Sequence, residues 1–103
     1  MPDATFKEFV LDQLHGLAGV EGRAMFGGVG LYRGGKFFGI IFKGALYFKT
    51  TEQTARLYLE RGMEPFQPSA TQTLKNYYEV PPDVIENARE LERWANNALG
   101  CAR

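Results

Sequence analysis

The stretch Met25-Phe26-Gly27-Gly28-Val29-Gly30-Leu31-Tyr32 decides the fold of this 103-residue chain, together with the Gly34-Gly35 pair and the apolar run Phe37–Phe42 that follow it. Closely spaced glycines allow a positive φ or a close approach of two backbones. Here they alternate with aromatic and aliphatic residues and lead into further β-like segments. The stretch therefore predicts the turns and close contacts of an antiparallel sheet, not a catalytic loop.

Tight turns connect the predicted strands to one another. Gly34-Gly35 is typical of a two-residue hairpin turn, and Lys43-Gly44 marks a second reversal. Strands joined in this way are antiparallel neighbours. The four strands expected here are residues 24–26, 29–33, 36–42 and 45–49.

The third of these strands is apolar on both sides. Strict alternation places two sets of residues on its opposite faces. One set is Phe38, Ile40 and Phe42, and the other is Phe37, Gly39 and Ile41. Helices are expected to cover one face, and a second subunit could cover part of the other.

Three helices frame the predicted sheet. The first starts at Asp3 or Thr5, with a capping box from Thr5 to Glu8, and carries an apolar stripe at helical spacing. The second begins after Thr50 or Thr51 and stops before Gly62. The last runs from about residue 83 to residue 99, and Gly100 closes it. The inner side of the second helix is expected to comprise Ala55, Tyr58 and Leu59.

Two further β segments lie between the second and third helices. Residues 63–68 contain Pro65 and Pro68, which restrict this segment to an edge strand or a loop. Residues 69–73 are predicted as a polar loop, and residues 74–80 as the last strand. The whole pattern predicts a single α+β domain, residues 1–103, in which an antiparallel sheet of about five strands is flanked by three helices in the order α-β-β-β-β-α-β-β-α.

A set of residues able to carry out catalysis is not apparent. The one histidine, His15, has Asp12 as its near acidic neighbour, and the one cysteine, Cys101, lies two residues from the C-terminus. The spacing of His, Cys and carboxylates matches no metal site, and Gly28-x-Gly30-x-x-Arg33 has Arg where the dinucleotide-binding motif has a third glycine. We expect a protein that is not an enzyme, with no catalytic or metal-binding residues and no cofactor.

The charge of the chain is zero overall but unevenly distributed. Between Arg23 and Lys75 the sequence has eight Lys and Arg against three Asp and Glu. Basic residues beside strand aromatics can bind nucleic acid, although they also protect sheet edges from association. The candidate nucleic-acid contacts are Arg33, Lys36, Lys49 and Lys75.

The sequence also has features that bear on location. It holds no apolar run long enough for a membrane span and no signal-peptide pattern at its start. One cysteine cannot form an intramolecular disulfide, as is common in reducing compartments. We therefore expect a cytoplasmic protein that does not bind a membrane.

Six ordered blocks of residues together resemble the TfoX N-terminal domain family, from about Leu14 to Leu99. They are Arg23-x-Met25-Phe26-Gly27-Gly28-x-Gly30-Leu31-Tyr32, Gly35-x-Phe37-Phe38, Leu46-Tyr47-Phe48-Lys49, Gly62-x-x-Pro65-Phe66, Tyr77-Tyr78-x-Val80-Pro81 and Trp94-Ala95. The resemblance implies an α+β domain with an antiparallel sheet and flanking helices. The family offers no catalytic residues to transfer, and we expect a structural role for its motif residues Arg23, Met25, Phe26, Gly27, Gly28, Gly30 and Tyr32.

Founding members of that family, TfoX or Sxy, regulate competence genes in bacteria and carry a second, helical domain, which we do not expect in this protein. We therefore expect a bacterial regulatory domain that binds a protein partner or a second copy of itself, without assigning it the competence role directly. Direct nucleic-acid binding is the first alternative and predicts that the basic residues converge on one face. A small-molecule sensor is the second and predicts a closed pocket near residues 26–30 with convergent polar groups.

Overall fold

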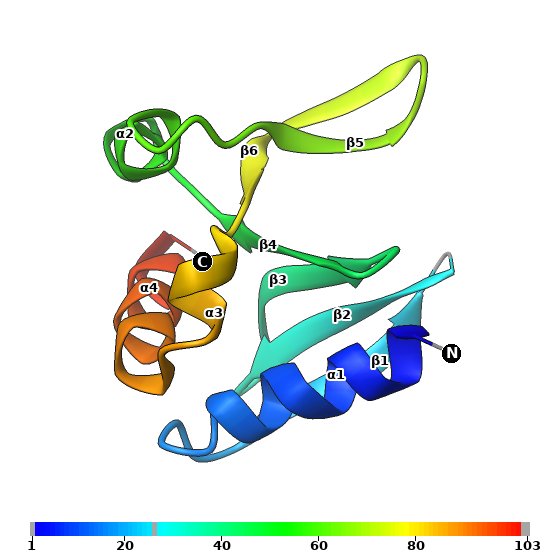
Figure 1. The fold of residues 1–103 in the computed structure, drawn as a ribbon, viewed down its shortest axis with the longest axis vertical. Helices are drawn as coiled ribbons and strands as arrows, with labels where there is room; N and C mark the ends of the chain where they lie inside the picture. Colours follow the sequence, from blue (N-terminus) through cyan, green and yellow to red (C-terminus); the bar gives the residue numbers. More distant parts are fainter. Residues whose placement is uncertain (1, 26, 102–103) are drawn as a thin grey trace.

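The computed structural model describes residues 2–25 and 27–101, which form a six-stranded antiparallel sheet and four helices (Figure 1). The α+β class and the order of the six β segments are as predicted, although only about five of them were expected to join the sheet, and the structure has four helices instead of three. In chain order the elements are α1 (Pro2–Gln13), β1 (Val20–Met25), β2 (Gly28–Arg33), β3 (Lys36–Phe42), β4 (Ala45–Lys49), α2 (Glu52–Leu59), β5 (Pro65–Ser69), β6 (Gln72–Glu79), α3 (Pro82–Ile85) and α4 (Ala88–Cys101).

The strand order across the sheet is β1-β2-β3-β4-β6-β5. The first four strands follow one another as hairpins. The chain then leaves the sheet through α2 and returns with β6 beside β4, so that β5 forms the far edge. Three residue pairs join β6 to β4, namely Tyr47 with Glu79, Phe48 with Tyr78 and Lys49 with Tyr77.

The predicted tight turns are confirmed. Gly34 and Gly35 connect the paired residues Arg33 and Lys36 with φ values of 58° and 81°. Lys43 and Gly44 do the same between β3 and β4, with φ values of 50° and 76°. Two successive positive φ angles are what a type I′ hairpin needs, and glycine adopts them without a Cβ clash.

Helices cover one face of the sheet, where the main core lies. Figure 1 shows α1 alongside β1 and β2 at one end of the sheet, and α3 and α4 beside β3 and β4. The core joins α1 to the last two helices through the inward residues of β2, β3 and β4. Its fully buried side chains include Val10, Leu14, Leu31, Phe38, Ile41, Leu46, Phe48, Val80, Val84 and Leu91.

The strict alternation predicted for β3 is wrong, because the strand contains an irregularity. Leu31 pairs with Gly39 while Tyr32 pairs with Phe37, so Phe38 is an extra residue opposite β2. After such a bulge, the side chains point to the face opposite the one that strict alternation predicts. Phe38 and Ile41 therefore lie in the main core, whereas Phe37, Ile40 and Phe42 lie together on the opposite face.

The last predicted helix is two helices. The four-residue α3 ends before Asn87, whose side-chain Oδ1 accepts a hydrogen bond from the backbone N–H of Glu90 at 3.2 Å. Asn87 thus caps α4, which continues through Gly100 to Cys101 instead of ending at Leu99. The spacing of Asn87 and Glu90 fits an N-terminal capping pattern, which is a sequence signal for the start of this helix.

Other helix ends differ in smaller ways. The first helix already begins at Pro2, so Thr5 lies inside it and not at its cap. Of the two candidate caps for α2, Thr51 is the one used, and it forms a capping box with Thr54. Gly62 follows that helix with a φ of 74°, as predicted. Leu59, expected on the inner side of α2, is 56% exposed.

Two strands are longer than predicted. The first begins at Val20 instead of Ala24. The segment expected as a polar loop is mostly strand, because β5 extends to Ser69 and β6 starts at Gln72. Only Ala70 and Thr71 remain as the turn, and β5 is the predicted edge strand with its two prolines.

Candidate functional site: an aromatic hollow on the second face of the sheet

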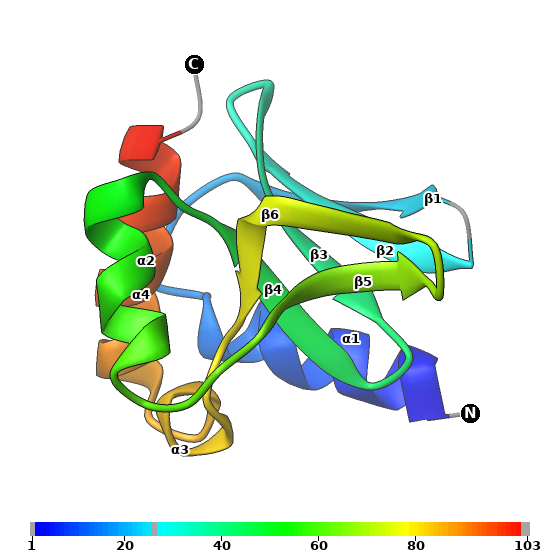
Figure 2. The same ribbon diagram turned by 90° about the horizontal axis from the view of Figure 1, so that it is seen from above.

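The hairpin of β5 and β6 bends over the sheet face that lies opposite the main core. Pro65 pairs with Tyr78, but the next residue, Phe66, pairs with Leu74. Residues 75–77 of β6 are thus extra relative to β5, and the strand turns a sharp corner there (Figure 2). Because such irregularities bend a strand, the outer half of the hairpin forms a wall above β2 and β3.

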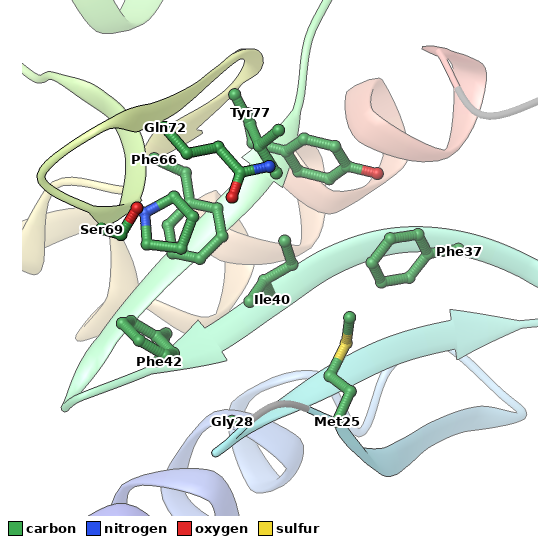
Figure 3. Close-up of a pocket in the computed structure, with 11 residues that line it drawn as sticks. Met25, Gly28, Phe37, Ile40, Phe42, Phe66, Ser69, Gln72 and Tyr77 are labelled. Carbon is green, nitrogen blue, oxygen red and sulfur yellow. The ribbon is translucent and has the colours of Figure 1, made fainter.

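A hollow of about 440 Å³ lies between this wall and the sheet (Figure 3). Its floor comes from β1, β2 and β3, and its wall from β5 and β6. In Figure 3, Met25 and Ile40 point into the space from below, and Gln72 points into it from the hairpin. The lining is mainly apolar and consists of Met25, Gly28, Phe37, Ile40, Phe42, Phe66, Pro68, Ser69, Gln72, Leu74 and Tyr77.

Aromatic packing closes one end of the hollow. The Phe66 ring lies 4.6 Å from the Tyr47 ring and 5.4 Å, edge to face, from the Phe42 ring, centroid to centroid. Phe66 is 5% exposed and Ile40 is 4% exposed, so this second cluster is well packed at its base. Side chains around it are half-buried and leave apolar surface accessible.

A row of aromatic rings runs across the same face. The Phe37 ring lies 5.1 Å from the Tyr32 ring and 5.7 Å from the Tyr77 ring. A cation covers each end of the row. The Arg23 guanidinium carbon is 4.9 Å from the Tyr32 ring centroid, and the Lys49 ammonium is 5.1 Å from the Tyr77 ring centroid.

The glycines of the opening motif let the strands and rings approach. A Cβ on Gly28 would lie 2.5 Å from the carbonyl oxygen of Ile41, and one on Gly30 would lie 2.7 Å from the Met25 sulfur. Gly27 has a φ of 78° and lies in the turn between the paired residues Met25 and Gly28. The motif residue Phe26 lies outside the described residues. These contacts fit the structural role expected for the motif.

Burial favours the neutral form of three acidic side chains on this face. It raises the pKa of the Tyr77 and Tyr47 phenols, and the Glu79 carboxylate adds to the effect on Tyr47. Burial also raises the pKa of Glu79, with a further contribution from the charge of Glu64. Neutral phenols and an apolar lining suit the binding of an apolar group.

The candidate nucleic-acid contacts do not share one place. The Arg33 Nε donates a hydrogen bond to the carbonyl oxygen of Ala18 at 2.8 Å, and Arg33 and Lys36 line a depression beside the turn that precedes β1. Lys75 lines another depression, beside Thr50 and the start of α2. Of these four residues, only Lys49 contacts the aromatic row, at the end opposite Arg23.

His15 and Cys101, the two residues considered for catalysis in the sequence, do not line the hollow. His15 is exposed in the turn after α1, with its Nδ1 2.8 Å from the carbonyl oxygen of Asp12. The Cys101 sulfur is 3.7 Å from the hydroxyl of Thr54. Within residues 2–25 and 27–101, no cluster of His, Cys, Asp and Glu could hold a metal ion, and no helix is long and apolar enough to cross a membrane.

Sequence reasoning missed the outer wall of the hollow. The pattern predicts an edge segment that contains Phe66 and Pro68 and a last strand that begins at Leu74. It does not indicate that these residues face β3 across a cavity. The signal available was the pair of prolines in a segment that also contains a large aromatic residue, since prolines accompany irregular edge strands.

Together these features define a class: an α+β domain whose antiparallel sheet is covered by helices on one face and holds an open aromatic hollow on the other. The TfoX N-terminal domain matches residues 12–102, which is most of the chain. The chain therefore belongs to the TfoX N-terminal domain family, as its six motif blocks indicated. No curated protein matches it in sequence.

Proposed function

We propose that this chain is a non-enzymatic interaction domain that acts in transcriptional regulation, in the bacterial cytoplasm, by binding a partner protein. The observation that carries the proposal is the aromatic hollow. A partner would insert an apolar side chain between the floor at Ile40 and the wall at Leu74. Buried apolar anchors of this kind supply most of the energy of many protein interfaces.

The size and chemistry of the hollow suit such an anchor. Its volume of about 440 Å³ exceeds that of one large side chain, so one or two residues of a partner would fill it. Ser69 and Gln72 stand at its edge, where their polar groups can bond the backbone of an entering segment. Apolar centres with polar rims are typical of protein interfaces.

The distribution of the basic residues supports a protein partner over a phosphate backbone. Arg33 with Lys36, Lys75, and Lys49 lie in three different places. A phosphate-binding surface gathers its cations on one path, because its affinity depends on several contacts made at once.

Single-stranded nucleic acid is the second candidate, and one observation favours it. The row Tyr32, Phe37 and Tyr77 has Arg23 at one end and Lys49 at the other. Aromatic rings flanked by cations stack unpaired bases in proteins that bind single strands. This site requires Arg23 and Lys49, whereas the proposed protein site requires the hollow.

The experiment compares four forms of the tagged protein in extract of the native host, with and without nuclease. Leu74→Gln alters the hollow, and Arg23→Gln combined with Lys49→Gln removes both cations. Phe9→Ser is the control, because the Phe9 side chain on α1 is 41% exposed. We expect a protein, identified by mass spectrometry, that resists nuclease, binds the wild type, the control and the cation variant, and is lost with Leu74→Gln. Circular dichroism of each purified variant checks that it is folded.

Two outcomes would overturn the proposal. Recovery that needs nucleic acid and disappears with the cation variant would establish the second candidate. A small molecule retained by the purified wild type in native mass spectrometry, and lost in Leu74→Gln, would show a sensor instead.

A further inference from the structure

The two edges of the sheet are protected to different degrees. At one edge, β5 carries Pro65 and Pro68, which have no N–H group to donate. At the other edge, β1 has no proline and pairs with β2 in unbroken register from Val20 to Met25. Within the described residues its other side has no partner strand. An edge of six residues that has neither a proline nor a partner strand is a template for another strand.

The charges on β1 are complementary to themselves. Glu21 and Arg23 flank Gly22 and lie on the same face of the strand, where they form an ion pair with 3.4 Å between Oε1 and Nη2. Both side chains are exposed, at 64% and 63% respectively. Each strand thus presents one acid and one base, two residues apart, at its free edge.

From this arrangement we propose that two copies of the chain form a dimer by antiparallel pairing of their β1 strands, centred on Gly22. The two-fold axis would be perpendicular to the sheet. Glu21 of each copy then faces Arg23 of the other, which makes two equivalent ion pairs across the axis. Backbone groups at every second residue of β1 are directed away from β2 and are free to bond the second copy.

Charge selects this register over its neighbours. Other two-fold symmetric pairings of β1 differ only in the residue that lies at the axis. The axis must pass through a residue, because side chains opposite each other must point to the same face. A centre at Glu21 places two glutamates opposite each other, and a centre at Arg23 places two arginines opposite each other. Only the centre at Gly22 pairs unlike charges twice.

The dimer would form one continuous sheet of two equal halves. The axis keeps the helices of both copies on one side and both aromatic faces on the other. Arg23 already lies over Tyr32 on the aromatic face, so the new ion pairs adjoin the two aromatic rows. This inference depends only on β1 and stands whether or not the hollow binds a protein.

Sedimentation equilibrium of the purified protein up to about 1 mM measures the association constant. We expect the wild type to approach twice the monomer mass. Arg23→Glu and Glu21→Arg each place like charges across the axis, and each should weaken the dimer at least about tenfold. The double exchange of Glu21→Arg with Arg23→Glu restores unlike pairs and should restore the dimer.

A mixing experiment separates charge complementarity from loss of fold. The Arg23→Glu variant carries two acids and the Glu21→Arg variant two bases, so an equimolar mixture should form a heterodimer although neither variant dimerises well by itself. Glu60→Arg, an exposed charge reversal at the C-terminal cap of α2, is the control and should dimerise like the wild type. A monomeric wild type, a dimer unaffected by either reversal, or folded variants that fail to pair on mixing would each overturn the proposal.

Discussion

The two faces of the sheet are built from the same strands but packed differently. On the covered face, Phe38 and Phe48 are 0% exposed beneath helices. On the other face, Ile40 and Tyr77 are nearly buried, but Phe37 and its neighbours keep accessible apolar surface around a hollow. Buried packing supports the fold, whereas accessible apolar surface in a concave site is typical of binding. Under the proposed function, the covered side of β3 supports stability and the other side supports binding.

Truncation of the adjacent rings Phe37 and Phe38 on β3 tests this difference between the faces and should change the free energy of unfolding more than the other substitutions. Phe38→Ala should lower the free energy of unfolding by about 3–5 kcal/mol, because it leaves a cavity in the main core. Phe37→Ala should cost about 1–2 kcal/mol, because its ring is half-buried. Urea unfolding followed by the fluorescence of Trp94, which is 5% exposed, measures both.

If Phe38→Ala is too unstable to study, Ile41→Val and Ile40→Val make the same comparison more gently. Ile41 lies in the main core and Ile40 in the base of the hollow. Equal losses in the ring pair would show that the two faces stabilise the fold equally, and the contrast between them would then be wrong.

Two neighbouring glycines sharpen the comparison at the rim of the hollow. Gly28→Ala should cost about 1–3 kcal/mol through overpacking against the carbonyl of Ile41. Gly27→Ala should cost about 1 kcal/mol through its positive φ. Asparagine tolerates that backbone conformation, so Gly27→Asn should recover much of the loss while Gly28→Asn should not. Thermal unfolding of the four variants distinguishes backbone strain from steric contact.

The cap of α4 tests how strongly the covered face depends on its helices. Asn87→Ala removes the acceptor for the N–H of Glu90 and should cost about 1 kcal/mol. Asn96→Ala, in the exposed middle of α4, is the matched control and should be neutral or slightly stabilising. If both variants unfold at the same urea concentration, the cap does not contribute to the stability of this face.

The smallest effect concerns a carboxylate of the uncovered face. The pKa of Glu79 is raised in the folded state, so the ionised group lowers stability at neutral pH, and stability is regained as pH falls through the raised pKa. Glu79→Gln should therefore unfold at higher urea than the wild type at pH 7. That advantage should shrink at about pH 4, where the wild-type carboxyl is largely protonated. Glu60→Gln, at the exposed C-terminal cap of α2, serves as the control.

Local signals in the sequence were enough for the main elements. The turns at Gly34-Gly35 and Lys43-Gly44 require positive φ angles that few residues adopt, so their type and position could be predicted. The cap at Thr51 and the stop at Gly62 are equally local. Each of these features is determined by a few consecutive residues.

The hollow could not be predicted because it depends on two breaks in strand pairing. Strict alternation would place Phe38 and Ile40 on the same face of β3. The bulge at Phe38 places Ile40 on the opposite face instead. Three extra residues in β6 bend the hairpin over that face. Both breaks are set by pairing between strands, which a period of two along one strand does not reveal. The glycine motif therefore predicted the strands that form the floor of the hollow, whereas nothing in the sequence predicted the position of the β5–β6 wall.

The narrow join between β4 and β6 has a consequence for motion. Three residue pairs hold β6 to β4, whereas six hold β1 to β2. Segments with few backbone pairs open at lower free energy than the rest of a domain. We expect the β5–β6 hairpin to open as a unit, with the amide hydrogen of Thr50, which bonds the carbonyl oxygen of Asn76 across this join, exchanging faster than those of Leu31 and Ile41. Each such opening would widen the hollow without unfolding the helix-covered core, so the wall of the site also acts as its entrance.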